Sequence, residues 1–204
     1  MALCPAPEAR VRLVFLGAAG VGKTALIRRF LQAPFEARHR RTVEELHLLE
    51  LEAGAGLRLS LEILDTSGSY SFPAMRRLCI GRADAFALVY ALPEPDSFAE
   101  VQRLRDEILE AKRGAAPLVL VGNKSDLAPG EPDPRLAAAR RDWGCPCLEA
   151  SAKQGRNVVG LFQELLRQVD LPGRLSPALQ RRRPQTFSKE PPRRSAKSHS
   201  CAVC

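Results

Sequence analysis

The segment GAAGVGKT, residues 17–24, stands between an apolar stretch at residues 11–16 and a helical pattern at residues 23–31. It satisfies the phosphate-loop pattern G-x-x-x-x-G-K-S/T in the strand–loop–helix context that this pattern requires. The glycines let backbone N–H groups turn toward phosphate oxygens, and the following helix adds the positive end of its dipole. We therefore predict a nucleotide phosphate site formed by Gly17, Ala18, Ala19, Gly20, Val21, Gly22, Lys23, Thr24 and Ala25.

Two side chains of this loop have chemistry of their own. Lys23 supplies a positive charge between the β- and γ-phosphates, and Thr24 places its hydroxyl on Mg²⁺. A glycine-rich turn that matches the pattern by chance is the alternative, but the flanking strand and helix patterns count against it.

Apolar, strand-like stretches alternate with amphipathic helical ones along the rest of the chain. The former are residues 11–16, 57–64, 86–92 and 118–121, and the latter are residues 23–31, 96–112, 134–143 and 156–169. This alternation is typical of an α/β fold with a mostly parallel sheet and helices on both faces. Alternating polar and apolar residues at 48–61, interrupted by Ala-Gly-Ala-Gly at 53–56, predict a hairpin that adds one antiparallel edge strand.

A second motif, NKSD, follows the stretch at residues 118–121 and contains Asn123, Lys124 and Asp126. Open α/β sheets bind ligands at such carboxyl ends of strands. An aspartate there accepts both N–H donors on the guanine edge, whereas adenine presents an acceptor at one of those positions. A site built on such hydrogen bonds rejects the wrong ligand by about 10⁴–10⁵-fold. A surface Asn-Lys turn is the alternative interpretation, and the spacing from the phosphate loop favours guanine binding.

Four motifs now stand in one order: GAAGVGKT, DTSG at residues 65–68, NKSD, and EASAK at residues 149–153. Their order and spacing over residues 10–170 resemble the Ras superfamily of small GTPases. The resemblance implies a P-loop NTPase G domain with a six-stranded sheet, bound GTP or GDP with Mg²⁺, and hydrolysis of GTP to GDP and phosphate. The segments DTSGSYSFPAMRRL and RTVEELH are most similar to the Ras-dva branch, with Dexras and Rhes as near relatives.

The resemblance assigns roles around the phosphates. It implies that Asp65 holds Mg²⁺ through water and that the Gly68 amide senses the γ-phosphate. It also implies that Thr42 is a second Mg²⁺-coordinating hydroxyl, released when the γ-phosphate leaves. Lys23, Thr42 and Gly68 are then the residues expected to act in catalysis.

The resemblance also assigns a base site and a partner site. Phe35 is expected to lie against the guanine base, which is backed by Ser151, Ala152 and Lys153. The segment Thr42, Val43, Glu44 and Glu45 is similar to the effector-binding stretch of Ras proteins. Loops tied to the γ-phosphate are ordered with GTP and loosened after hydrolysis, which makes a two-state switch.

Two positions and one segment depart from the Ras pattern. Ser69 stands where Ras proteins have the glutamine that orients the attacking water, and Ala19 replaces a glycine crowded against the γ-phosphate. A methyl group at residue 19 obstructs an arginine finger, which contributes about 10³–10⁵ in rate in the general scheme worked out on Ras itself. Residues 38–41, Arg-His-Arg-Arg, replace a nucleotide-covering tyrosine and its acidic and proline neighbours. This basic cluster either selects an acidic partner or lipid, or is a solvated loop.

Ser69 and Ala19 predict slow GTP hydrolysis. The alternative is a constitutively GTP-bound scaffold, or pseudo-GTPase, that signals through partner binding rather than a hydrolysis cycle. A metabolic P-loop kinase is a third class, which NKSD and EASAK count against because such kinases do not read guanine in this way.

The charge of the chain is concentrated at its end. Residues 171–204 hold eight of the 31 Lys and Arg residues but one of the 23 acidic ones, so nearly all of the net charge of +8 lies in this tail. We expect a flexible N-terminus at residues 1–9, a G domain at 10–170 and a flexible basic tail at 171–204. The first residues lack the features of a secretory signal and no apolar run is long enough to span a bilayer, so we expect a cytosolic chain with free thiols.

The last four residues, Cys-Ala-Val-Cys, fit the C-a-a-X prenylation motif and predict a lipid on Cys201. A C-x-x-C redox or metal pair is the alternative. One lipid alone binds membranes marginally, and the basic residues of the tail supply a second signal, so we expect an anionic membrane surface as partner. Nucleic acid is disfavoured because the tail has almost no aromatic residues for base stacking.

The expected location is therefore the cytoplasmic face of a membrane, with the plasma membrane preferred. The other expected partners are effector proteins at the switch regions and a guanine-nucleotide exchange factor. We expect a monomer.

Overall fold

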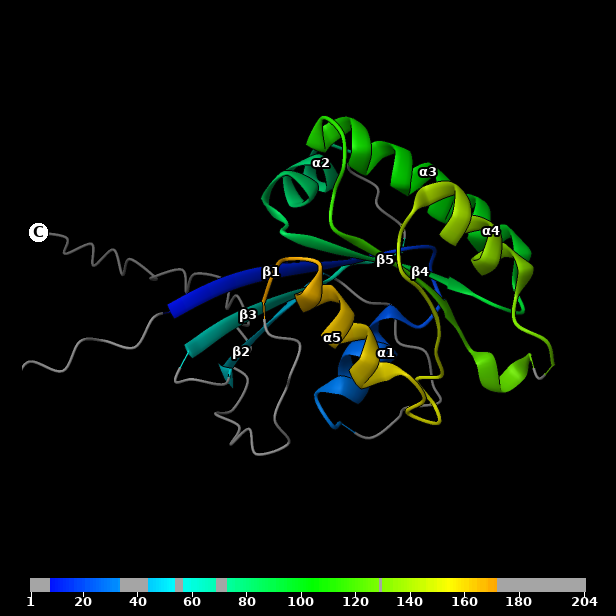
Figure 1. Ribbon diagram of the computed structural model, residues 1–204, viewed down its shortest axis with the longest axis horizontal. Coiled ribbons are helices and arrows are strands. Elements are labelled where there is room, and N and C mark those ends of the chain that lie inside the picture. Colours follow the sequence, from blue (N-terminus) through cyan, green and yellow to red (C-terminus); the bar gives the residue numbers. More distant parts are fainter. Residues whose placement is uncertain (1–7, 34–43, 54–56, 69–72, 129, 172–204) are drawn as a thin grey trace, which may run out of the picture.

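The computed structural model describes residues 8–33, 44–53, 57–68, 73–128 and 130–171 (Figure 1). Its centre is a six-stranded sheet of order β2-β3-β1-β4-β5-β6. The strands are β1 (Glu8–Leu16), β2 (Glu45–Ala53), β3 (Leu57–Asp65), β4 (Ala85–Ala91), β5 (Leu118–Asn123) and β6 (Cys147–Glu149). β2 pairs with β3 in the antiparallel direction, and the other pairings are parallel.

Helices cover both faces of this sheet. α1 (Lys23–Phe30) and α5 (Val158–Arg167) pack on one face, and α2 (Pro73–Arg82), α3 (Pro95–Lys112) and α4 (Pro134–Trp143) pack on the other (Figure 1). A single turn of 3₁₀ helix, η1 (Ser125–Leu127), follows β5. Most of the strand residues between the helical layers are apolar, and β4 and β5 are buried along their whole length. Parallel strands covered on both faces are expected to be continuously apolar in this way.

The hydrophobic core has two parts because successive side chains of a strand point to opposite faces. Leu13 and Phe15 of β1 pack with α1 and α5, and the ring of Phe162 lies 3.6 Å from that of Phe30. Val14 and Leu16 of the same strand pack with α2, α3 and α4. One strand thus holds together both layers and ends directly at the loop GAAGVGKT.

The predicted α/β fold with a mostly parallel sheet, helices on both faces and one antiparallel edge strand is confirmed. Element bounds differ by a few residues: β1 begins at Glu8, before the apolar stretch at residues 11–16, and α5 is shorter at both ends than predicted. The apolar pattern did not predict α2 or the three-residue β6. α2 exposes Met75 and Leu78, so its sequence lacks a clear apolar stripe.

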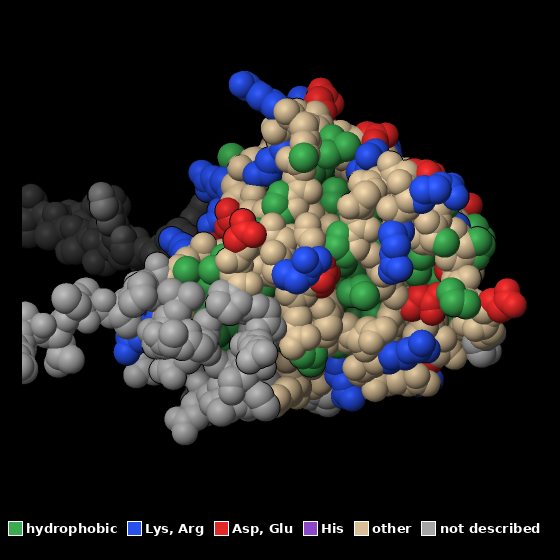
Figure 2. Space-filling view, viewed as in Figure 1, with side chains coloured by type: hydrophobic (Ala, Val, Ile, Leu, Met, Phe, Trp, Pro, Cys, Tyr) green, Lys and Arg blue, Asp and Glu red, His purple; other side chains and the backbone are tan. Residues whose placement is uncertain are grey.

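Charges of both signs are interspersed among apolar side chains over the face shown in Figure 2. None of the described helices combines the length and apolar composition needed to cross a bilayer.

Candidate functional site

The loop between β1 and α1 has a backbone that its glycines make possible. Gly17 has a φ of 145°, and a Cβ there would lie 2.0 Å from the carbonyl oxygen of Val89. Gly22 caps α1 with a φ of 97°, and a Cβ there would lie 2.3 Å from Nδ2 of Asn123. Because L-residues rarely adopt such φ values, these two positions require glycine on both conformational and steric grounds. The loop is thus shaped around the neighbouring strands β4 and β5.

Lys23 folds back across this loop. It is buried, and its Nζ donates hydrogen bonds of 2.8 Å to the carbonyl oxygens of Gly17 and Ala18. Burial lowers the pKa of Lys23 from 10.5 to about 8, while the Asp65 carboxylate opposes the shift. Lys23 therefore remains a cation at neutral pH, held where its charge faces the loop.

Asp65 brings a carboxylate from the carboxyl end of β3. It is fully buried, and neither carboxylate oxygen has a hydrogen-bond partner of good geometry among the residues that the structure describes. Burial raises the pKa of Asp65 from 3.8 to about 6, while Thr24 and Lys23 act in the opposite direction. Oxygen ligands of this kind suit Mg²⁺, and a buried carboxylate is costly unless cations balance its charge. The side chains of Asp65 and Thr24 thus fit a hard divalent cation.

The DTSG segment returns to the phosphate loop at Gly68. A Cβ on Gly68 would lie 2.1 Å from the backbone nitrogen of Ala19. Thr66 anchors the same segment, since its buried hydroxyl donates a 2.5 Å hydrogen bond to the carbonyl of Phe15 in β1. The two segments expected to meet the γ-phosphate therefore lie against each other.

Asn123 joins three motifs. Its Nδ2 donates to the carbonyl of Val21 in the phosphate loop at 2.8 Å, and its Oδ1 accepts from the backbone N–H of Ala152 at 3.2 Å. The side chain is 2% exposed. These two hydrogen bonds link the loops that follow the carboxyl ends of β1 and β6 to the carboxyl end of β5.

Asp126 and Ser151 face each other beside Asn123. Ser151 Oγ donates to Asp126 Oδ1 at 2.6 Å and accepts from the backbone N–H of Gln154 at 3.1 Å. Lys153 Nζ lies 3.9 Å from Asp126 Oδ2. A carboxylate oriented by a hydroxyl and a nearby ammonium is an acceptor with a defined direction, suited to adjacent N–H donors.

Lys124 has a left-handed backbone with a φ of 64°, and its Nζ lies 2.6 Å from Glu94 Oε1. Glu94 precedes α3 and was not among the predicted site residues. A second missed group is Asp133, which caps α4 and accepts from the N–H of Arg135 at 2.9 Å. The dipeptide Asp133-Pro134 is a helix-start signal that could have identified this cap, but its connection to the base site is visible only in three dimensions.

The structure does not describe all the predicted site residues. Phe35, Thr42, Val43, Ser69 and Cys201 lie outside the described residues. Of the predicted effector segment, Glu44 precedes β2 and Glu45 begins it, opposite Asp65 in the antiparallel register.

Comparison with known proteins gives one consistent similarity. A family model described as "Ras family" matches residues 12–171. GTP-binding protein Rhes of Homo sapiens is 40% identical over 186 residues, which are 84% of this chain and 69% of the relative. GTP-binding protein Rhes of Mus musculus is 39% identical over 183 residues, which are 82% of this chain and 68% of the relative.

Proposed function

The chain belongs to the Ras family of small GTPases, and from this premise we propose a membrane-anchored signalling switch that binds guanine nucleotide with Mg²⁺ and hydrolyses GTP slowly. The two Rhes proteins are named as GTP-binding proteins, and the match to them covers most of both chains. The similarity also supports the expectation that Rhes is a near relative; closeness to the Ras-dva branch stays a prediction.

One observation carries guanine binding: the pair of hydrogen bonds made by Asn123 to Val21 and Ala152. It holds a phosphate-binding loop and a base-binding loop at a set separation. Asp126 then accepts hydrogen bonds from the two N–H groups of the guanine edge, and Ser151, Ala152 and Lys153 lie behind the guanine ring. Phe35 lies against the base.

The phosphate end uses a different set of residues. Gly17, Ala18, Ala19, Gly20, Val21, Gly22 and Ala25 bind through the backbone of the loop and the first turn of α1. Lys23 binds the β- and γ-phosphate oxygens, and Thr24, Thr42 and Asp65 hold Mg²⁺, with Asp65 acting through water. A Mg²⁺ ion held by these residues would neutralise phosphate charge. The backbone N–H of Gly68 meets the γ-phosphate.

Slow hydrolysis follows from Ala19 and Ser69. Ala19 is exposed and lies against Gly68, so its methyl group occupies the neighbourhood in which an arginine finger acts. A serine directly after Gly68 is too short to orient the attacking water. The remaining catalytic contributions come from Lys23, Thr42 and Gly68 through charge and positioning.

The partners follow from the switch and the tail. Effectors bind at Thr42, Val43, Glu44 and Glu45, and an exchange factor replaces GDP by GTP. The G domain at residues 10–170 is a monomer. The tail at 171–204 anchors it at the cytoplasmic face of the plasma membrane through a prenyl group on Cys201 and basic residues near anionic lipid.

The test is the nucleotide carried by protein purified from cells, separated by chromatography and followed over hours of incubation with Mg²⁺. We expect bound GTP that converts to GDP over hours. Conversion within minutes contradicts slow hydrolysis, and the absence of any guanine nucleotide contradicts the function itself. GTP that does not convert at all favours the constitutively bound scaffold, which the same two residues support.

A further inference from the structure

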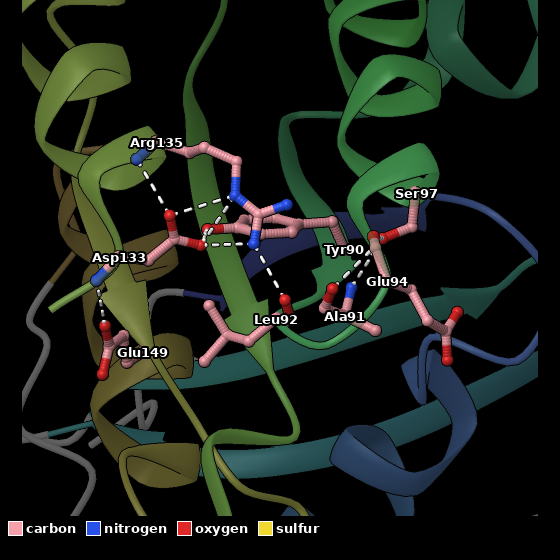
Figure 3. A network of polar contacts seen from close by, with 8 residues as sticks. All are labelled: Tyr90, Ala91, Leu92, Glu94, Ser97, Asp133, Arg135 and Glu149. Atoms are coloured by element: carbon pink, nitrogen blue, oxygen red, sulfur yellow. Dashed lines mark hydrogen bonds and ion pairs between the residues drawn. The ribbon is translucent and has the colours of Figure 1, made fainter. Parts of the chain in front are cut away.

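A polar network joins the start of α4 to the end of β4 (Figure 3). Arg135 Nε donates to both carboxylate oxygens of Asp133 at 3.0 and 2.9 Å, and its Nη2 donates to the carbonyl of Leu92 at 2.8 Å. The Asp133 side chain is 8% exposed. A planar guanidinium can make these contacts together because its donors form a rigid fork. Arg135 thus fixes the backbone at Leu92 relative to α4.

Tyr90 contributes both its hydroxyl and its ring to the network. Its buried hydroxyl donates to Asp133 Oδ2 at 2.9 Å, and Arg135 lies over its ring at 5.0 Å from the centroid. Burial and the adjacent Asp133 carboxylate raise the pKa of Tyr90 well above 10, so this hydroxyl remains a donor. A Cβ on Gly122 would lie 3.0 Å from this hydroxyl, so Tyr90 also packs against the strand that leads to NKSD.

The proposed base site has two arms, the segments NKSD at residues 123–126 and EASAK at residues 149–153. The network contacts the NKSD arm through Leu92. Leu92 accepts from Arg135 with its carbonyl and donates from its N–H to the carbonyl of Asn123 at 2.9 Å. Two residues further along, Glu94 pairs with Lys124. The position of Asn123, and of Asp126 after it, is therefore tied to α4.

The network reaches the EASAK arm through Glu149, which is visible beside Asp133 in Figure 3. The backbone N–H of Asp133 donates to Glu149 Oε1 at 2.9 Å. Glu149 is two residues before Ser151, and its own carbonyl accepts from Asn157 Nδ2 at 2.7 Å. Asp133 thus holds the base of the loop whose serine orients Asp126.

We propose that Asp133 and Arg135 are positioning residues for guanine recognition, which set the two arms of the base site at the spacing that Asp126 needs. The inference rests on the proposed guanine binding. Asp126 must meet two N–H donors of the base at once, so a small displacement of either arm weakens one of the two hydrogen bonds. Loss of the network lowers the preference for guanine over hypoxanthine, which lacks the 2-amino group.

The experiment compares GDP with IDP on the full chain. The Arg135→Ala variant is expected to release GDP about five- to tenfold faster and to lower the ratio of GDP to IDP affinity by a similar factor, a coupling of ordinary size for residues that act through others. Arg135→Lys is expected to recover only part of the ratio, because an ammonium lacks the fork that holds Asp133 and Leu92 together. Urea unfolding of each variant measures stability separately.

Glu62→Gln is the matched control. Glu62 is another buried carboxylate held by two arginines, Arg10 and Arg12, but it lies in β3, which β1 and β4 separate from the strand β5 that carries Asn123. This change is expected to lower the unfolding midpoint and leave the GDP to IDP ratio within about twofold of wild type. An equal change of ratio in Glu62→Gln and Arg135→Ala would show a general loss of stability and overturn the inference.

If Arg135→Ala does not fold, the Tyr90→Phe variant tests the positioning role instead. It removes one hydroxyl from Asp133 and keeps the ring under Arg135, and the same lowering of the ratio is expected at about two- to threefold. An unchanged ratio in Tyr90→Phe, or in a folded Arg135→Ala, overturns the inference while the proposed function stands. A wild-type chain that binds neither GDP nor IDP overturns the proposed function first.

Discussion

The side-chain amide of Asn123 donates a 2.8 Å hydrogen bond to the carbonyl of Val21, a residue 102 positions earlier in the chain. It connects the loop after β5 to the loop after β1. The bond is buried, so its loss leaves the Val21 carbonyl without this donor in a place from which water is excluded.

Asn123→Ala is expected to release GDP about 30–150-fold faster, because two buried hydrogen bonds are lost at about 1–1.5 kcal/mol each. Dissociation of a fluorescent GDP analogue measures this rate. Ser125→Ala is the control: its buried hydroxyl has no hydrogen-bond partner among the described residues, so its removal is expected to leave stability unchanged or slightly higher. A release rate for Asn123→Ala within twofold of wild type would contradict the linking role.

Gly22→Ala is expected to destabilise the protein by more than 2 kcal/mol, since it adds a steric overlap with Asn123 Nδ2 to an unfavourable φ of 97°. Gly144→Ala is the comparison, because Gly144 has a φ of 64° but no atom within 4 Å of the added Cβ. It is expected to cost about 1 kcal/mol. Urea denaturation compares the two, and equal losses would mean that the overlap is relieved by a small shift.

The stability of the fold is expected to depend on pH through the ionisation of Glu62. Burial opposes its ionisation, but hydrogen bonds from Arg12 and Arg10 outweigh this and hold the pKa below 4.5. A carboxyl group with a lower pKa in the folded state stabilises the fold above its unfolded pKa, and this contribution is lost as the pH falls below 4.5. Glu62→Gln is therefore expected to cost about 1–3 kcal/mol at pH 7 and progressively less below pH 4.5.

Denaturation of both proteins between pH 3 and 7 tests this dependence. Glu100→Gln is the control, since the half-buried Glu100 pairs with the more exposed Arg103 one helical turn away, and its loss is expected to cost less than about 0.5 kcal/mol. A constant difference between wild type and Glu62→Gln across this pH range would contradict the ionic contribution.

Ala19→Gly combined with Ser69→Gln is expected to speed single-turnover GTP hydrolysis at least about tenfold, because it restores a water-orienting amide and room for an arginine finger. Phosphate release from preloaded GTP measures the rate, with and without a Ras-type activating protein. The hydrolysis rates of the single variants, Ala19→Gly and Ser69→Gln, show which of the two residues slows hydrolysis more. Wild-type hydrolysis at the rate of the double variant would refute the proposed slow turnover.

Several parts of the fold were predictable from local patterns. The helix at Pro134–Trp143 was predicted with its observed bounds because proline at its first position is a strong start signal. The edge hairpin was predicted from alternation around a glycine-containing turn. By contrast, β6 has three residues, too few for any periodicity, and α2 is only partly buried. Both depend on neighbours that are distant in sequence.

The sequence alone determined the chemistry of this protein: the glycines and lysine of GAAGVGKT, the aspartate of NKSD and the order of the four motifs predict a guanine nucleotide site, because phosphate loops and base-edge acceptors require particular residue types at short spacings. The tertiary structure decided how the parts act together. It brought Asn123 to Val21, left the Asp65 carboxylate buried without a hydrogen-bond partner of good geometry among the described residues, and tied Asp133 and Arg135 to both segments of the proposed base site. These relationships join residues tens of positions apart, and parallel strands meeting at one edge of a sheet create them, so no local pattern records them.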